Sequence, residues 1–171
     1  MRWTKLLPLT GPLLAITLVA PPADAAPAGR FDWPLHPRPP VLRRFDKPPR
    51  DWLPGHRGVD LGGAAGQSVL AAGDGVTIFA DEVGGKPVVS IDHPSGLRTT
   101  YEPVRAAVPE GRRVRRGEVV GSLEPGHPGC PGVCLHWGLR RGHDYLDPLG
   151  ALRTAPLRLK PLTPAPPEAK Q

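Results

Sequence analysis

The feature that most constrains this chain is a series of short β-rich segments separated by turn sequences between positions 55 and 152. The segments are SVLAA, GVTIFA, PVVSIDH, LRTTYEPV, EVVGSL and CLHWGLR, and the turns between them, GDG, GGK, HPSG, EGRR and GHPG, all contain glycine. No window of about 11 residues carries a convincing helical apolar period. This pattern predicts one small all-β domain over 55–153.

The first 25 residues have a different pattern. MRWTK supplies two positive charges, an apolar run broken by proline and glycine follows, and the small-x-small sequence ADA ends at Ala25. A membrane anchor would need roughly 20 unbroken apolar residues, so the pattern favours a secretory signal peptide over 1–25, cleaved after Ala25. We therefore expect an exported protein, secreted or associated with the cell wall, with no membrane span after cleavage.

The segments on either side of the β-rich region differ from it in composition. Positions 26–54 are rich in proline and arginine and are expected to form an extended arm, with Trp33 and Trp52 able to pack onto the body. The tail, 154–171, is rich in proline and has no aromatic residue, which is typical of disorder. The core of the domain is modest, so a metal or a disulfide would help to hold it.

The charge balance limits the class of partner. The chain has 22 Lys and Arg against 16 Asp and Glu, a net charge of +6. A basic exported protein suits a polyanionic surface such as a cell wall. The basic residues come as scattered pairs and aromatic residues are few, which argues against nucleic-acid binding. We expect a monomer whose partner is a cell-wall polymer.

One segment carries candidate metal ligands. GHRGVDLG places His56, Gly58 and Asp60 at even spacing, so in an extended strand all three lie on one face. The glycine leaves room between an imidazole and a carboxylate. In the apolar segment CLHWGLR, His136 offers a third donor from a second strand. Two imidazoles and one carboxylate are a common ligand set for catalytic zinc, with a position left open for water.

The two cysteines of the chain are Cys130 and Cys134. In an oxidising compartment a disulfide is expected, and the turn PGV can bring their Cα atoms within about 6 Å. The alternative is that Cys134, which shares a face with His136, binds the metal as a fourth ligand and closes the site. The disulfide is favoured, and both alternatives stay open.

From Gly55 to about Leu152 the sequence resembles the lysostaphin-type, or LytM-type, zinc endopeptidases of bacterial cell walls. HRGVD matches the family's His-x-Gly-x-Asp, VRRGEVVGSL its Val-x-x-Gly-x-x-Ile-Gly turn, and CLHWGLR occupies the place of His-x-His. The resemblance implies a small antiparallel β-sheet or sandwich domain (the duplicated hybrid motif) that cuts peptides of peptidoglycan. It also implies that zinc is held by His56, Asp60 and His136.

Two positions depart from the family pattern. Cys134 stands where the family's first histidine of His-x-His acts on the bound water or the developing oxyanion. Glu102 or Pro103 stands where a second catalytic histidine is expected. Glu102 then becomes the candidate general base, against the alternative of a solvated turn carboxylate. Turn positions are expected for the remaining histidines near the sheet, His93, His127 and His143.

Two functions remain in view. The first is an exported zinc metalloendopeptidase acting on peptidoglycan, with activity reduced by the missing histidines. The second is a non-catalytic wall-binding or hydrolase-activating module of the same fold. Domains that lose catalysis often lose their metal ligands too, so the intact ligand set favours the enzyme.

Overall fold

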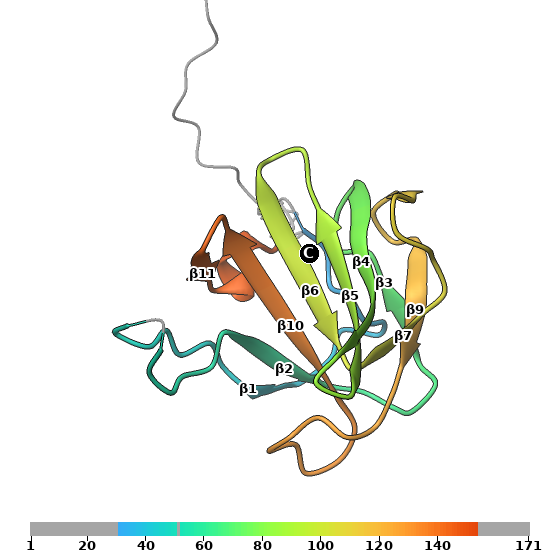
Figure 1. Ribbon diagram of the computed structural model, residues 1–171. Coiled ribbons are helices and arrows are strands. Elements are labelled where there is room, and N and C mark those ends of the chain that lie inside the picture. Colours follow the sequence, from blue (N-terminus) through green and yellow to red (C-terminus); the bar gives the residue numbers. More distant parts are fainter. Residues whose placement is uncertain (1–30, 51, 154–171) are drawn as a thin grey trace, which may run out of the picture.

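The computed structural model of the protein describes residues 31–50 and 52–153 (Figure 1). The signal peptide predicted over 1–25 and the disordered tail predicted over 154–171 lie outside these residues. The described part of the chain has no α-helix, and its one helical element is the 3-10 turn η1 (Pro148–Ala151). No described helix has the length and apolar character needed to cross a membrane. The all-β prediction is confirmed.

The strands of the described residues form two antiparallel sheets. The larger has the order β1-β2-β10-β6-β5-β4-β8, with β11 added beside β10, and the smaller has the order β3-β9-β7. The small sheet packs against the part of the large sheet formed by β4 and β5 (Figure 1). The strand bounds are β1 Val41–Arg43, β2 Gly58–Gly62, β3 Ser68–Leu70, β4 Gly75–Val83, β5 Lys86–Asp92, β6 Leu97–Glu102, β7 Val104–Ala106, β8 Arg113–Val114, β9 Val119–Leu123, β10 Cys134–Arg141 and β11 Asp144–Leu146.

The central strands of the large sheet have one face in the core and one face open. On β10, Leu135, Trp137 and Leu139 are buried in the apolar core, whereas His136 and Arg140 line a groove on the other face. This alternation follows from the period of two in a strand. Burying large apolar side chains contributes about 1.5–3 kcal/mol each, so the core holds β10, and with it His136, in a fixed position.

The segment that precedes β1 packs onto the domain. Phe31 and Leu35 are fully buried in the core, and the N–H of Phe31 donates to the carbonyl oxygen of Ala151. Trp33 packs against this core, as expected, but Trp52 is 75% exposed. The described part of the region 26–54, where an extended arm was expected, thus supplies buried residues to the core.

Candidate metal centre

Three neighbouring strands bring the candidate ligands together. On β10, His136 pairs in antiparallel register with Asp60 of β2 on one side and with Glu102 of β6 on the other. His56 lies two residues before β2, where it forms an isolated bridge with Asp46. Residues that pair directly across antiparallel strands point to the same face. The open face of the sheet therefore carries both the predicted ligands and the predicted base.

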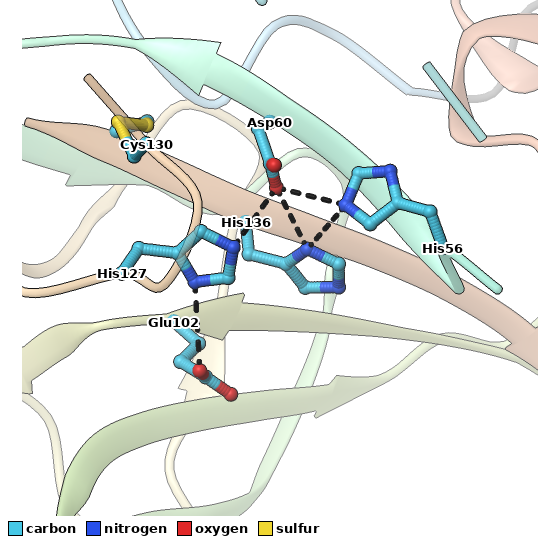
Figure 2. The surroundings of a disulfide bond; sticks show 7 residues. His56, Asp60, Glu102, His127, Cys130 and His136 are labelled. Carbon is cyan, nitrogen blue, oxygen red and sulfur yellow. Dashed lines mark hydrogen bonds and ion pairs between the residues drawn. A yellow bond between two sulfur atoms is a disulfide. The ribbon is translucent and has the colours of Figure 1, made fainter. Parts of the chain in front are cut away.

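The three predicted ligands present their donor atoms to one point (Figure 2). His56 Nε2 lies 2.9 Å from Asp60 Oδ1 and 3.1 Å from His136 Nδ1, and His136 Nδ1 lies 2.9 Å from Asp60 Oδ1. Two donors on a tetrahedral zinc ion, each about 2.0–2.1 Å from the metal, are about 3.3 Å apart. This triangle of two nitrogens and one oxygen therefore fits zinc in size and in chemistry.

The backbone orients His56 toward that point. Its Nδ1–H donates to the carbonyl oxygen of Arg44 over 2.7 Å, which leaves Nε2 as the nitrogen with a free lone pair. Histidines that bind metals usually donate their other ring N–H to a carbonyl or carboxylate in this way. The hydrogen bond thus selects the tautomer that a metal ligand needs.

Gly58 makes room for the ring of His136. A Cβ at this position would lie 2.7 Å from His136 Nε2 and 2.6 Å from the carbonyl oxygen of Trp137. Because real Cβ atoms essentially never approach so closely, no other residue fits here without moving β10. Glycine is needed at this position because of His136 on the neighbouring strand. The spacing of residues along β2 does not reveal this requirement.

His127 joins the cluster from the loop 124–133 between β9 and β10. Its Nε2 lies 3.2 Å from Asp60 Oδ1, its Nδ1 lies 3.6 Å from Glu102 Oε1, and its ring stacks on that of His136 (Figure 2). One donor atom from each of His56, Asp60, His127 and His136 lies within 4.8 Å of the others. His127 is in a loop, as expected. Its position beside the candidate metal ligands was not predicted.

A disulfide joins Cys130 to Cys134, with their Cα atoms 6.3 Å apart. Of the two alternatives left open by the sequence, the bridge is the one found, so the sulfur of Cys134 is not free to be a ligand. Cys134 is the first residue of β10, and the bridge ties the loop of His127 to the strand of His136. The closeness of His127 to Cys130 in the sequence was the one signal that could have placed it here.

The charges of the cluster depend on one another. Burial by itself raises the pKa of Asp60, but hydrogen bonds from His127 and His136 outweigh it and hold that pKa far below its usual range. The contact with Asp60, followed by that with Glu102, raises the pKa of His127 to about 9, although burial opposes the rise. Asp60 is therefore a carboxylate at neutral pH, as a metal ligand must be.

Glu102 is half-buried at the edge of the cluster. Its Oε1 accepts a hydrogen bond from Lys86 Nζ over 2.9 Å and faces His127 on the other side. The contact with His127 lowers the pKa of Glu102 to about 2, with Lys86 adding to this effect and burial opposing it. The side chain lies within the site, as the candidate base would have to, and is ionised at neutral pH.

A groove of about 630 Å³ runs from the cluster along the open face of the sheet. His136 and Glu102 lie at one part of its lining, and Arg98 and Arg140, which pair across β6 and β10, lie further along it. Its apolar lining comes mainly from β4 and β5, through Ile78, Phe79, Val83 and Val88.

The two other histidines expected in turns lie outside the cluster. His93 is buried, its Nδ1–H donates to the carbonyl oxygen of Asp74, and its Nε2 is hydrogen-bonded to the Thr99 hydroxyl. Burial lowers the pKa of His93, against the effect of its backbone hydrogen bond. His143 is exposed in the turn between β10 and β11. Neither lies among the donor atoms of the metal cluster.

A protein of Mycobacterium tuberculosis, Rv2891, which is described as uncharacterized, is 52% identical to this chain over 148 residues. The match covers 81% of this chain and 59% of that protein, so the chain spans less than two thirds of the length of this relative. This similarity carries no activity with it.

Solved structures show the same fold. Csd3 of Helicobacter pylori superposes with a TM-score of 0.60 at 28% identity, over 78% of this chain and 36% of that one. Lysostaphin superposes with a TM-score of 0.59 at 17% identity, over 77% of this chain and 62% of that one, which shows the fold alone. The antiparallel fold implied by the resemblance is confirmed.

The family itself is identified by residues 54–148, which match the family model described as peptidase family M23. This range begins two residues before His56 and ends within η1, so it contains the whole cluster described above. From this match, the chain belongs to peptidase family M23.

Proposed function

We propose that the protein is an exported, zinc-dependent endopeptidase that hydrolyses peptide bonds of cell-wall peptidoglycan. The observation that carries this proposal is the triangle of donor atoms from His56, Asp60 and His136, which lies beside a groove on the open sheet face. When bound there, zinc would polarise a peptide carbonyl and make a water molecule acidic at neutral pH.

The residues of the chain would bind and orient the reacting groups. The register of β2 against β10 holds Asp60 beside His136, and the Arg44 carbonyl holds His56. A peptide that lies in the groove would pass His136 and Glu102, because both line it. The ligand triangle and the candidate base would therefore meet the same peptide bond.

Glu102 is the proposed proton acceptor. Its carboxylate is ionised at neutral pH, but a pKa of about 2 makes it a weak base. A positioned general base typically contributes about 10²- to 10⁴-fold to a rate, and a weak one contributes less. Because neither Cys134 nor Glu102 is the histidine of the family pattern, we expect slow turnover.

Export is part of the proposal. It is supported by the signal-peptide pattern over 1–25 and by the disulfide between Cys130 and Cys134. Disulfides persist mainly in oxidising compartments outside the cytosol. Peptidoglycan, a polymer with anionic groups, is also a suitable partner for a chain with a net charge of +6.

The second candidate is a non-catalytic module of the same fold that binds the wall or activates a separate hydrolase. One observation favours it: the residue at the first position of the His-x-His pattern, Cys134, is held in a disulfide and cannot transfer protons. The enzyme remains the better supported reading, because a purely binding role gives no reason to keep three convergent metal ligands.

The test is to purify the oxidised chain, measure its zinc content and follow the release of new amino groups from isolated peptidoglycan. We expect about one zinc per chain and slow release that a chelator stops. The variant His56→Ala should lose both, whereas His143→Ala, at an exposed histidine outside the cluster, should retain both. If zinc-loaded protein releases no amino groups above background, the enzyme is excluded. Sedimentation with peptidoglycan then tests the binding module.

A further inference from the structure

We propose that His127 is a fourth protein ligand of the metal centre, so that the loop 124–133 closes the centre in its resting state. This inference rests on the proposed function in one respect, the presence of a metal at the triangle. It assigns to the loop a role that neither the resemblance nor the family match supplies. Four observations support it: a donor distance, the spacing of the rings, the surroundings of the second ring nitrogen of His127, and the way the loop is anchored.

The distance from His127 to Asp60 is that of two ligands on one ion. His127 Nε2 lies 3.2 Å from Asp60 Oδ1, close to the spacing of about 3.3 Å expected between two donors of a tetrahedral zinc ion. The donor atoms of all four residues lie within 4.8 Å of one another. His127 Nε2 therefore lies close enough to Asp60 Oδ1 for both atoms to bind the same ion.

The rings are spaced as ligands would be. The ring centres of His56 and His136 are 4.9 Å apart, and those of His127 and His136 are 5.1 Å apart. Two imidazoles on one tetrahedral zinc ion have their centres about 5.2 Å apart, given the usual zinc-to-nitrogen distance. The ring of His127 is therefore about as far from the ring of His136 as is the ring of the predicted ligand His56.

The second nitrogen of His127 has the environment of a ligand. Its Nδ1 is buried without a hydrogen-bond partner within 3.5 Å, and the nearest carboxylate oxygen, Glu102 Oε1, is 3.6 Å away. Metal-binding histidines usually direct their other N–H to a carboxylate or a backbone carbonyl. Glu102, which faces His127 in Figure 2, would serve His127 as the Arg44 carbonyl serves His56.

The loop explains how such a ligand could be both held and released. At its start the N–H of Glu124 donates to the Pro103 carbonyl over 3.0 Å, and near its end the disulfide ties Cys130 to β10. His127 lies between these two anchors. A centre with four protein ligands is closed to substrate, so a peptide could reach the ion only after the loop has moved His127 aside.

The experiment compares zinc affinity and cobalt spectra for the wild-type chain and three variants. His127→Ala removes the proposed ligand, His127→Gln keeps its bulk, and His143→Ala is the control at an exposed histidine. Zinc dissociation constants come from competition with a chelating dye, and the coordination of the metal from the visible spectrum of the Co²⁺-loaded protein. We expect His127→Ala and His127→Gln to weaken zinc binding at least about tenfold and to change the cobalt spectrum.

Dissociation constants within about twofold of the wild type, with an unchanged cobalt spectrum, would overturn the proposal. If His127→Ala does not fold, His127→Gln decides by the same two readouts. Release of amino groups by the wild-type chain is measured separately. Weakened zinc binding without any release contradicts the proposed function and leaves the fourth ligand in place. Release with unchanged zinc binding in both His127 variants contradicts only the fourth ligand.

Discussion

Gly58 on β2 faces the imidazole of His136 on β10 so closely that an added Cβ would lie 2.7 Å from Nε2. We therefore expect Gly58→Ala to push the ring away from Asp60 and His56. Zinc affinity, measured by competition with a chelating dye, should fall at least about tenfold, as it does when the supports of a ligand are removed.

The matched control is Gly138→Ala, also on the open face of the sheet. A Cβ at Gly138 would lie 3.6 Å from the carbonyl oxygen of Arg57 and 3.7 Å from Thr100 Cβ, which is ordinary van der Waals contact. This variant should bind zinc as the wild type does. An equal loss of affinity in both variants would mean that added methyl groups disturb the sheet in general, and the specific role of Gly58 would be refuted.

Glu102→Gln should reduce the turnover of peptidoglycan peptides at least about tenfold while the chain keeps about one zinc, since a general base acts on the rate. The carboxylate lies in the groove with His136, but it is not in the ligand triangle. Glu118→Gln, which alters a partly exposed carboxylate paired with Arg112, is the control. Turnover at the wild-type level in the Glu102 variant would remove Glu102 from the mechanism.

The air-oxidised protein should show no free thiol until it is denatured and reduced, because Cys130 and Cys134 are bridged. Thiol titration under native and denaturing conditions checks this. Cys130→Ser should then weaken zinc binding by less than His127→Ala does, because it loosens the loop but leaves the ligand in place. Two thiols that react in the native, air-oxidised protein would contradict the bridge.

His93 should make the protein less stable as the pH falls below about 6.5. Burial lowers its pKa from the ordinary value of 6.5, so between the folded and unfolded pKa values the unfolded chain binds more protons. The free energy of unfolding then decreases as the pH decreases. Urea unfolding of chelator-treated protein at about pH 6.5 and pH 5 measures the loss.

The comparison variant is His93→Gln, in which the loss of stability between these two pH values should be smaller. His127 does not interfere, because its raised pKa contributes stability that is fully present below 6.5 and is lost only as the pH rises through about 9. The stability that Glu102 contributes through its lowered pKa is fully present above its ordinary pKa of 4.5 and is lost only as the pH falls below that value. An equal loss in wild type and variant would show that His93 is not the group responsible.

Much of the fold could be predicted from local pattern. The segments GVTIFA, PVVSIDH and CLHWGLR make up most of β4, β5 and β10. Alternating or apolar runs between glycine turns have few other ways to bury their side chains. The packing of Phe31 and Leu35 could not be predicted, because a segment rich in proline shows no period and is placed by tertiary contacts alone.

The site divides in the same way. The spacing of His56 and Asp60 and the apolar strand around His136 carry enough information to predict a three-ligand centre, which the structure brings together. The position of His127 depends on the path of a loop and on a disulfide that folds it back over β10. The loop sequence has no periodicity from which that path could be predicted. The histidine in GHPGC therefore cannot be told from an ordinary turn residue by sequence.

The alternation along β10 has a consequence for how such a protein can change in length. Leu135 and Trp137 point into the core while His136, between them, points to the metal centre. Inserting or deleting one residue before His136 within this strand would exchange inside for outside, burying the imidazole and exposing the indole. Gains and losses of single residues before His136 within this strand are therefore incompatible with both folding and metal binding.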